Sequence, residues 1–430
     1  MKSYKNYLLT ILTAMLAFNY MDRFALGLVL QNIKMDLHLS DSQLGLLSGI
    51  AFALFYSVLG VPLARWADRG NRVTIISLSI GLWSVAVAVC GAARTFIQLM
   101  LIRVIVGVGE SGCVPASLSL ISGFFSRDER PRAVSIYMQG VSASVLFGYF
   151  AAGWLNQLFG WRIMFVGIGL PGIALALLAI LTIKEAPDRK AQLATAAPPS
   201  ESFMQVCSFL LRRATFRHML YCCAVNWFFI YGIMQWTPAF FVRSFGMKTG
   251  ELGTWLAAIY GISFIAGFHL GGEWVTRFAL RNEWRQLRAM AIITYVAGVL
   301  AALTYIPATA PNYYLAFLWL GLSTLTGSAV SGPQFAVIES LMPARMQSVA
   351  VALVYLVGNL VGLGLGPWAT GALSDALRPW LGEESLRYAL LLLSPVCVWS
   401  GWHFWAAAKT VAKDLEQAHS PATEPHAEYG

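Results

Sequence analysis

Residues 95–121, TFIQLMLIRVIVGVGESGCVPASLSLI, form a long apolar stretch that contains two charged residues, Arg103 and Glu110. A second such stretch, YLLTILTAMLAFNYMDRFALGLVL at residues 7–30, contains Asp22 and Arg23. An ionisable group inside a bilayer costs about 2.5 kcal/mol or more, so such groups usually face a bundle interior or a water-filled cavity. These four residues therefore indicate a transport path or a proton relay within a membrane.

The composition favours a membrane protein. The chain has 430 residues, of which 57% are hydrophobic and 12% are charged, whereas about 25% of residues in a typical soluble protein are charged. Twelve apolar spans approach the ~20 residues that a membrane-spanning helix needs: 7–30, 43–64, 74–93, 95–121, 133–156, 162–183, 217–242, 252–275, 287–306, 312–337, 347–371 and 387–408. We expect helices, because these spans are too long and too uniformly apolar for barrel strands. The predicted fold is an all-α membrane protein.

The basic residues predict the orientation of the chain. With a cytoplasmic N-terminus, 21 of the 30 Lys and Arg residues lie on the cytoplasmic side and 7 on the other, and Arg23 and Arg103 lie within the membrane. Positive charge accumulates in cytoplasmic loops, so both termini are predicted to be cytoplasmic, in the cell (inner) membrane. The net charge of +9 is then a topology signal and an attraction to anionic membrane lipids, not to nucleic acid.

The chain divides into two similar halves. We predict an N-terminal six-helix half at 1–183, a cytoplasmic linker at 184–216, a C-terminal six-helix half at 217–408 and a cytoplasmic tail at 409–430. The linker is polar and is expected to contain a short amphipathic helix around Phe203–Leu211. Similar Pro/Arg turns follow spans 4 and 10, which indicates a duplicated unit with pseudo-two-fold symmetry and a site between the halves.

Arg103 and Glu110 are seven residues apart, so they lie two helical turns apart on nearly the same face. The simplest arrangement pairs them with Asp22 and Arg23, since two acids and two bases cancel in formal charge. Glu110 is the candidate proton carrier, because a carboxyl group that exchanges its Arg partner between conformations changes its affinity for a proton. The alternative is a static ion-pair network that fixes the helix register.

Polar residues of the second half offer a possible substrate lining. The candidates are Asn226, Trp227, Tyr231, Gln235 and Trp236 in span 7 and Asn359 among the glycines of span 11. The alternative is that they form hydrogen bonds between helices. The Gly-rich stretches Gly140–Gly153 and Gly358–Gly366 are expected to allow close helix packing and bending.

Several stretches resemble a known family. The segment Asp68-Arg-Gly-Asn-Arg72 resembles the Major Facilitator Superfamily signature Gly-x-x-x-Asp-Arg-x-Gly-Arg-Arg, although Ala64, Asn71 and Val73 depart from it. Five stretches are similar to its spinster-like lipid transporters: Asp22-Arg-Phe-Ala-Leu-Gly-Leu28, Leu39-Ser-Asp-Ser-Gln-Leu-Gly-Leu-Leu47, Ala51-Phe-Ala-Leu-Phe-Tyr56, Val108-Gly-Glu-Ser-Gly-Cys113 and Phe241-Val-Arg-Ser-Phe-Gly-Met247. The resemblance covers almost the whole chain and is denser in the first half. Related bacterial anion symporters also carry an Asp-Arg in span 1 and a Gly-x-Glu in span 4.

The resemblance implies roles for the four intramembrane charges. Glu110 and Asp22 are expected to serve proton coupling. Arg23 and Arg103 would be their switching partners or would hold an anionic head group, because the planar guanidinium group binds phosphate or carboxylate with two hydrogen bonds.

The resemblance also implies a cytoplasmic gate formed by Asp68, Arg69 and Arg72, which would tie the two halves together when the cytoplasmic side is closed. The alternative for the two arginines is an ordinary topology signal. Asp68 could instead cap the start of span 3.

We therefore predict a monomeric, proton-coupled secondary transporter. It would move a lysophospholipid-like or sphingoid-like amphiphile by alternating access. One alternative is a proton-coupled uptake symporter for small organic anions. Another is a polytopic lipid enzyme, which the scattered positions of the six His residues disfavour. No metal site, cofactor or nucleotide-binding loop is expected.

Overall fold

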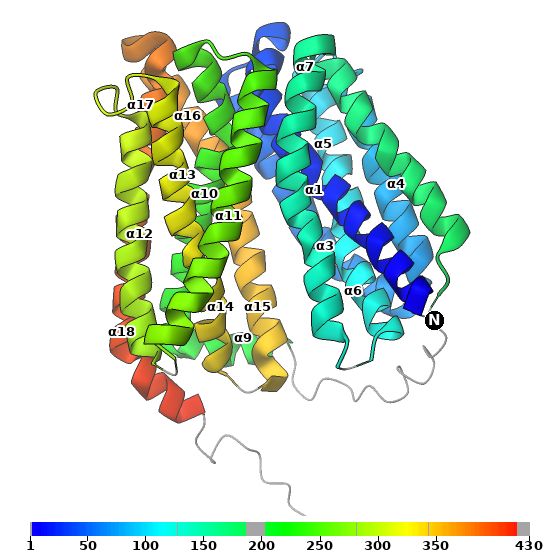
Figure 1. Ribbon diagram of the computed structural model, residues 1–430, viewed down its shortest axis with the longest axis vertical. Coiled ribbons are helices and arrows are strands. Elements are labelled where there is room, and N and C mark those ends of the chain that lie inside the picture. The colour runs from blue at the N-terminus through cyan, green and yellow to red at the C-terminus, as the bar shows by residue number, and fades with distance from the viewer. Residues whose placement is uncertain (1, 127, 186–202, 281, 343, 419–430) are drawn as a thin grey trace, which may run out of the picture. The chain divides into compact units, whose positions relative to one another are not determined.

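The computed structural model describes residues 2–126, 128–185, 203–280, 282–342 and 344–418. Within these ranges the regular elements are all helices, as Figure 1 shows. The predicted all-α fold is confirmed for this part of the chain. Most of the linker predicted at 184–216 and the last residues of the predicted tail lie outside the described residues, and the domain boundaries stay a prediction.

Several helices of the first half end at a glycine or begin at a polar cap. They are α1 (Lys2–Leu37), α2 (Asp41–Ser48), α3 (Ile50–Arg69), α4 (Arg72–Cys90), α5 (Phe96–Ser111), α6 (Cys113–Phe124) and α7 (Arg130–Thr182). Ser40 and Gln43 form a reciprocal capping box at the start of α2. Within α7 the backbone turns at Gly160, which has φ 82° and joins the two spans predicted at 133–156 and 162–183.

The second half begins with the short amphipathic helix α9 (Phe203–Arg212), which confirms the helix expected there. It continues with α10 (Ala214–Phe245), α11 (Thr249–Phe278), α12 (Glu283–Tyr305), α13 (Tyr313–Ala329), α14 (Ser331–Ser340) and α15 (Ala344–Gly358). The π-helix η1 (Asn359–Leu365) leads into α16 (Gly366–Leu381), followed by η2 (Gly382–Glu384), α17 (Ser385–Leu393) and α18 (Val396–Ala418). The π-helix occupies the Gly-rich stretch that was expected to allow bending.

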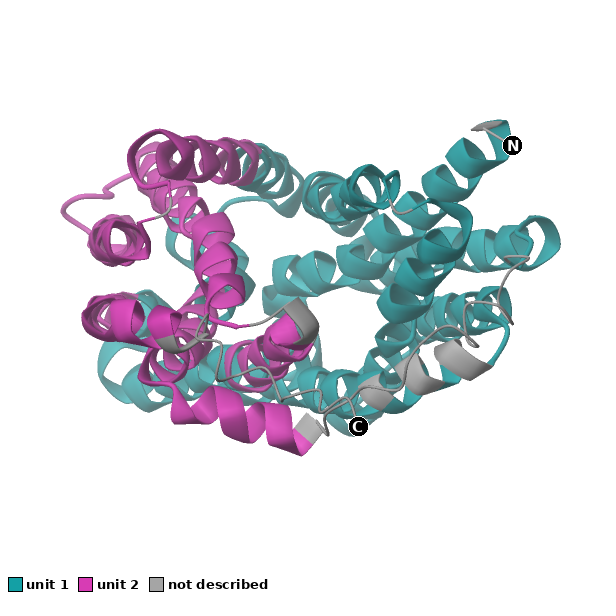
Figure 2. Ribbon diagram, turned by 90° about the horizontal axis from the view of Figure 1, so that it is seen from below, with its two compact units in different colours: residues 1–197, 231–261, 363–390 teal, residues 198–230, 262–362, 391–430 magenta. Residues whose placement is uncertain are grey.

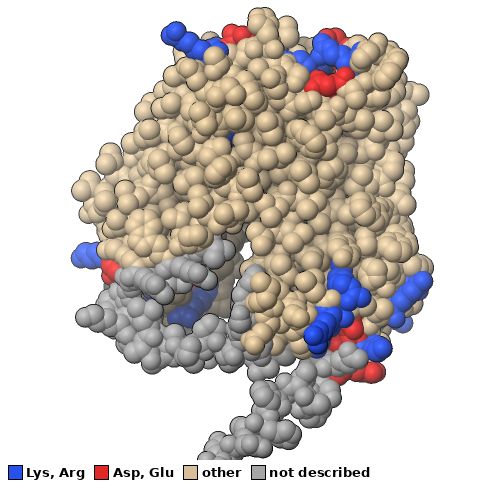
Figure 3. Space-filling view, turned by 180° about the vertical axis from the view of Figure 1, so that it is seen from behind, with Lys and Arg blue, Asp and Glu red and all other residues tan. Residues whose placement is uncertain are grey.

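By length and composition, 8 stretches of the described residues could cross a membrane. Two of them, with 53 and 68 residues, are longer than one crossing needs and each contains two predicted spans. On the face shown in Figure 3, charged side chains gather near the two ends and leave a broad band of other residues between them. This pattern fits lipid contact around the band, and the count of twelve spans stays a prediction.

The helices form two compact units, coloured in Figure 2. Unit 1 comprises residues 1–197, 231–261 and 363–390, and unit 2 comprises residues 198–230, 262–362 and 391–430. The helices α10, α11, η1 and α17 each continue from one unit into the other. The two units therefore do not coincide with the two halves predicted from the sequence. The units are groups of residues in contact, whereas the halves follow the order of the spans and their internal similarity.

Glycines allow the backbones of unit 1 to approach closely. A Cβ atom at Gly153 of α7 would lie 2.4 Å from the carbonyl oxygen of Thr249, and one at Gly253 of α11 would lie 2.3 Å from that of Tyr149. In the same unit, a Cβ atom at Gly45 of α2 would lie 2.4 Å from the carbonyl oxygen of Pro367 in α16. Small residues at such contacts are typical of helix packing in membranes.

Unit 2 has its own core. Its buried apolar side chains come from α9, α10, α12, α14, α15 and α18. Arg213, between α9 and α10, donates to the carbonyl oxygen of Leu341, and the nearby backbone N–H of Thr215 donates to Asp414 Oδ2 over 2.7 Å. These contacts join the start of α10 to the end of α18 within the unit.

Candidate functional site

Two ion pairs join α1 to α5 inside unit 1. Arg103 Nη1 lies 2.6 Å from Asp22 Oδ2. Arg23 Nη2 and Nε donate to Glu110 Oε2 over 2.5 and 3.0 Å. The pairing of the first and fourth predicted spans through these four groups is therefore confirmed, whereas their role in coupling stays a prediction.

The two pairs differ in exposure. The side chains of Asp22 and Glu110 are fully buried, and that of Arg103 is 1% exposed. The side chain of Arg23 is 11% exposed, so it is the least buried of the four.

Each carboxylate uses one oxygen in its ion pair and leaves the other without a donor. Asp22 Oδ1 and Glu110 Oε1 are both buried and have no hydrogen-bond partner among the described residues. The two carboxyl groups are also close enough to repel each other electrostatically when both are charged. A buried carboxylate oxygen without a donor is costly as long as the group is charged, and a proton would remove that cost.

Aromatic rings surround Arg23. Its Cζ lies 4.4 Å from the ring centroid of Tyr20, 4.7 Å from that of Phe52 and 4.8 Å from that of Tyr56. These distances are typical of cation–π contacts. Sequence reasoning missed this aromatic shell, although Phe52 and Tyr56 lie in one of the stretches that carry the family resemblance.

The predicted lining residues of α10 divide between the units. In unit 1, Tyr231 is half-buried and interacts electrostatically with Arg23. Gln235 lies against Gly27 of α1, and its Nε2 is buried without an acceptor in the described part of the chain. A part in substrate lining stays a prediction for both residues. Trp236 is fully buried, and its Nε1 donates to the carbonyl oxygen of Pro367 over 2.8 Å, which favours a packing role.

The other predicted lining residues lie in unit 2. Asn226 and Asn359 are half-buried. Trp227 packs on the backbone of Gly358 and Gly362, where a Cβ atom would lie 2.3 and 2.6 Å from Trp227 atoms. The glycines of this stretch therefore make room for an indole ring, and a part in substrate lining stays a prediction for all three residues.

At the predicted cytoplasmic gate, the side chains of Asp68 and Arg69 lie outside the described residues. Arg72 is buried at the start of α4, and its backbone N–H donates to Glu185 Oε2 over 2.7 Å. The N-cap of α4 is Asn71, whose side chain accepts from the backbone N–H of Thr74. Sequence reasoning missed Glu185. This residue follows the last helix of the first half and binds the backbone at the start of α4.

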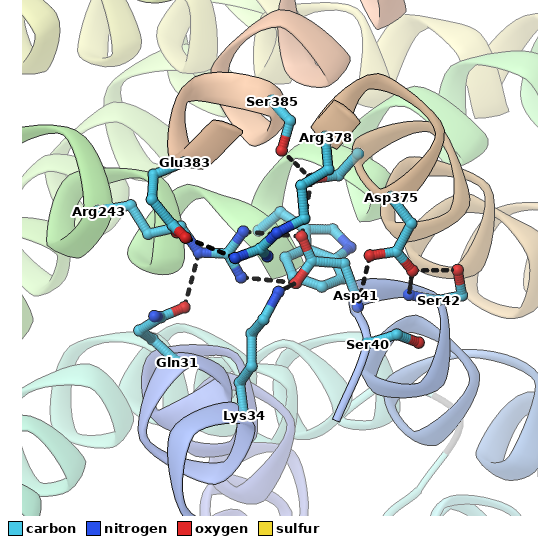
Figure 4. A network of polar contacts seen from close by, with 12 residues as sticks. Gln31, Lys34, Ser40, Asp41, Ser42, Arg243, Asp375, Arg378, Glu383 and Ser385 are labelled. Atoms are coloured by element: carbon cyan, nitrogen blue, oxygen red, sulfur yellow. Dashed lines mark hydrogen bonds and ion pairs between the residues drawn. The ribbon is translucent and has the colours of Figure 1, made fainter. Parts of the chain in front are cut away.

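A second buried ion cluster was also missed. Asp41, at the start of α2, is fully buried and accepts from Lys34 Nζ over 2.6 Å and from both Nη atoms of Arg243 over 2.7 Å, as Figure 4 shows. It also accepts from Ser374 Oγ over 2.7 Å. Lys34, Asp41, Arg243 and Ser374 are called the Asp41 cluster below. It joins α1 and α2 to α10 and α16 within unit 1.

Further contacts support the Asp41 cluster. Asp375 of α16 accepts from the backbone N–H groups of Asp41 and Ser42 over 3.0 and 2.7 Å, where an anion suits the start of a helix. Burial and the neighbouring Arg243 lower the pKa of Lys34, which lies beyond the first predicted span, and its hydrogen bond with Asp41 opposes this. Sequence analysis gave no site role to Lys34, Asp41 or Arg243, although Asp41 and Arg243 lie in two of the stretches that carry the family resemblance.

The described residues hold no group of three or more His, Cys, Asp or Glu side chains that could bind a metal ion.

Curated relatives match almost the whole chain. An MFS-type efflux pump of Mycolicibacterium smegmatis is 29% identical and covers 89% of this chain and 89% of its own. Protein spinster homolog 1 of Xenopus tropicalis is 26% identical over 95% of this chain and 83% of its own. A probable galactarate/D-glucarate transporter of Bacillus subtilis is 25% identical over 88% and 89%.

A solved structure has the same fold. The crystal structure of a bacterial homolog to the human lysosomal transporter Spinster, in an inward-facing and unoccupied conformation, matches with a TM-score of 0.85 and 27% identity. It covers 98% of this chain and 100% of its own. The model of the Major Facilitator Superfamily matches residues 12–367. The chain therefore belongs to the Major Facilitator Superfamily, has spinster-like relatives, and is a multi-pass membrane transporter rather than an enzyme.

Proposed function

We propose that this transporter couples the movement of an amphiphilic, lipid-like substrate to protons. The observation that carries the proposal is the pair of buried carboxylates in α1 and α5, each of which keeps one oxygen without a hydrogen-bond donor in the described residues. The four charges of Asp22, Arg23, Arg103 and Glu110 cancel, so one added proton leaves an unbalanced positive charge in a buried place. An anionic ligand can then neutralise this positive charge, or a change of conformation can expose the charge to water.

Glu110 is the proposed proton carrier and Asp22 its partner acid. Glu110 is fully buried, and its Arg23 partner has the more exposed guanidinium group of the two arginines. Protonation of Glu110 would weaken its ion pair with Arg23 and free that guanidinium group for another anion. Proton binding and substrate binding would thus be linked through Arg23.

The surroundings of Arg23 suit an amphiphile. A phosphate or carboxylate head group can bind the guanidinium group with two hydrogen bonds. The rings of Tyr20, Tyr56 and Tyr231 then offer apolar faces next to the charge. A lysophospholipid or sphingoid-like molecule combines both features, and the spinster homologs among the relatives support this choice of substrate class.

We place the protein in the cell (inner) membrane as a monomer with both termini cytoplasmic. The excess of Lys and Arg on one side of the predicted spans supports this orientation. The Asp41 cluster then lies at the outer end of α1, where its contacts would hold that end closed. Asp68, Arg69 and Arg72 would form the corresponding gate at the cytoplasmic end.

Transport of small organic anions is the second candidate. It is favoured by the similarity to a probable galactarate/D-glucarate transporter, and Arg23 would bind a carboxylate as readily as a phosphate. The two candidates differ in the apolar part of the substrate, so a direct comparison of substrates separates them.

The test uses purified protein in proteoliposomes with an imposed pH gradient, and compares a lysophospholipid with galactarate. We expect gradient-driven movement of the lysophospholipid by the wild type. Glu110→Gln should abolish it and spare substrate exchange without a gradient, because Gln keeps the shape and loses only the titration. The matched control is Glu129→Gln, whose exposed carboxylate pairs with Lys5 away from the spans.

Three outcomes contradict parts of the proposal. If Glu110→Gln still concentrates substrate under a pH gradient, the carrier is not Glu110 and Asp22 is left as the candidate. If only galactarate moves, the substrate class is wrong. If a pH gradient has no effect on the wild type, proton coupling is wrong.

A further inference from the structure

One phenyl ring contacts both arginines of the site. The Cζ atom of Arg23 lies 4.7 Å and that of Arg103 lies 5.3 Å from the ring centroid of Phe52. Both distances fall within the range of cation–π contacts. Phe52 comes from α3, whereas the four charged residues come from α1 and α5. A third helix therefore meets both ion pairs through a single side chain.

The ring has little freedom to move. Phe52 is 1% exposed and its ring stacks on that of Tyr56, with 5.4 Å between the ring centroids. A Cβ atom at Gly107 of α5 would lie 2.8 Å from the carbonyl oxygen of Phe52 and 3.4 Å from its Cδ2. Gly107 lies between Arg103 and Glu110 in sequence, so the absence of its side chain lets Phe52 reach this position.

We infer that Phe52 is a positioning residue that keeps Arg23 on Glu110 and Arg103 on Asp22. The two guanidinium groups repel each other, and each is attracted to the electron-rich ring of Phe52. The ring therefore favours separate positions for the two groups, one on each ion pair. The pairing itself is seen in the structure, and its importance for coupling rests on the proposed function. With the ring in place, each carboxylate keeps one fixed guanidinium partner.

Other titratable groups also lie near the four charged residues. These are Tyr20 of α1, Tyr56 of α3, Cys90 of α4, Cys113 of α6 and Tyr231 of α10. Tyrosine and cysteine side chains carry no positive charge, so the arginines supply the positive charge next to the acids.

Loss of the ring should change how the acids take up protons. Without Phe52, the guanidinium groups gain room and lose an attraction that fixes them, and each can move away from its carboxylate. A carboxylate that loses a fixed positive neighbour binds its proton more tightly. The midpoint of protonation should therefore move to higher pH. We expect a shift of about one pH unit, because one unit corresponds to a free energy similar to that of one cation–π contact between buried groups.

The test titrates the infrared band of protonated carboxyl groups in purified protein in detergent, which requires no substrate and no transport. Glu110→Gln identifies the part of the band that belongs to Glu110. Phe52→Leu and Phe52→Met both remove the ring, and the adaptable Met fills the space if Leu folds poorly. Phe52→Tyr keeps the ring. Phe165→Leu is the control, because Phe165 is equally buried and its ring meets that of Trp161 edge to face.

We expect Phe52→Leu and Phe52→Met to raise the midpoint, and Phe52→Tyr and Phe165→Leu to keep it at the wild-type value. An unchanged midpoint in the first two variants, or an equal rise in Phe165→Leu, would overturn the inference. If wild-type transport ignores a pH gradient while the infrared midpoint still depends on the ring, the proposed coupling is wrong and the positioning role of Phe52 stands.

Discussion

The pair of Arg103 and Asp22 is the more deeply buried of the two ion pairs in α1 and α5. Their side chains are 1% and 0% exposed, and 2.6 Å separates Arg103 Nη1 from Asp22 Oδ2. A buried pair adds little net stability over apolar packing, but removal of one partner leaves a buried charge uncompensated. The effect of a substitution at this pair therefore depends on the charge that it leaves behind.

We predict that Arg103→Ala lowers the free energy of unfolding by about 3–5 kcal/mol, because it leaves the Asp22 carboxylate buried and unpaired. Thermal unfolding of the purified protein in detergent measures this. The double variant Arg103→Ala with Asp22→Asn should regain most of the loss, since it removes the orphaned charge. If the double variant is no more stable than Arg103→Ala, the loss comes from packing and the electrostatic explanation is wrong.

At this scale the sequence predicted the charged residues and missed their surroundings. Asp22, Arg103 and Glu110 stand out because charge is rare inside apolar spans. Phe52 gives no such signal, because one aromatic residue among apolar neighbours looks the same whether it faces lipid or an arginine. Only the packing of α3 on α5 reveals it.

Close helix contacts in unit 1 depend on glycines. Gly153 of α7 faces Gly253 and Thr249 of α11, and Gly45 of α2 faces Pro367 of α16. Within a membrane no hydrophobic effect drives helices together, so close backbone approach and interhelical hydrogen bonds are the main source of their attraction. At the α7–α11 contact, Asn156 Nδ2 also donates to Thr249 Oγ1 over 3.0 Å.

We predict that Gly153→Ala destabilises the protein by about 1–3 kcal/mol, because its methyl group would overpack the contact with α11. The new Cβ atom would lie 2.4 Å from the carbonyl oxygen of Thr249. The matched control is Gly60→Ala in α3, where no heavy atom of the described residues beyond the local helix backbone lies within 4 Å of the added Cβ atom. Thermal unfolding should separate the two variants, and equal stability would contradict the role of the contact.

The helix ends show how far hydropathy predicts elements. The predicted span 43–64 is broken at Gly49 into α2 and α3, and the predicted span 95–121 is broken at Gly112 into α5 and α6. A Cβ atom at Gly49 would lie 2.3 Å from the carbonyl oxygen of Gly364. Hydropathy averages over such positions, so it locates an apolar span and cannot show where another backbone breaks it.

For the whole molecule, the sequence predicted the family and the membrane-spanning class but not the contacts between distant segments. Lys34, Asp41 and Arg243 lie at helix ends, where charges ordinarily report topology. Their convergence with Ser374 depends on contacts between residues more than 200 positions apart, as between Asp41 and Arg243, whose separation is 202. No local pattern encodes such a contact, so the Asp41 cluster could be found only in the structure.

The Asp41 cluster should hold one end of the transporter closed, and its loss should expose buried residues at that end. Thr370 of α16 is fully buried one helical turn before Ser374, so Thr370→Cys is a suitable reporter for a water-soluble maleimide. We predict slow labelling of this reporter in an otherwise wild-type protein. Arg243→Gln should speed the labelling clearly, because Asp41 loses two charge-assisted hydrogen bonds of 2.7 Å.

The matched control is Arg162→Gln with the same reporter. Arg162 pairs with Asp36 in the same unit, but their side chains are 40% and 42% exposed, and exposed pairs contribute about 0–1 kcal/mol. Labelling in this control should therefore stay slow. A Tm close to that of the wild type must accompany faster labelling in Arg243→Gln, because general unfolding would expose Thr370 as well. Equal labelling rates in the two variants would mean that the closed end depends on the glycine contacts and not on the buried charges.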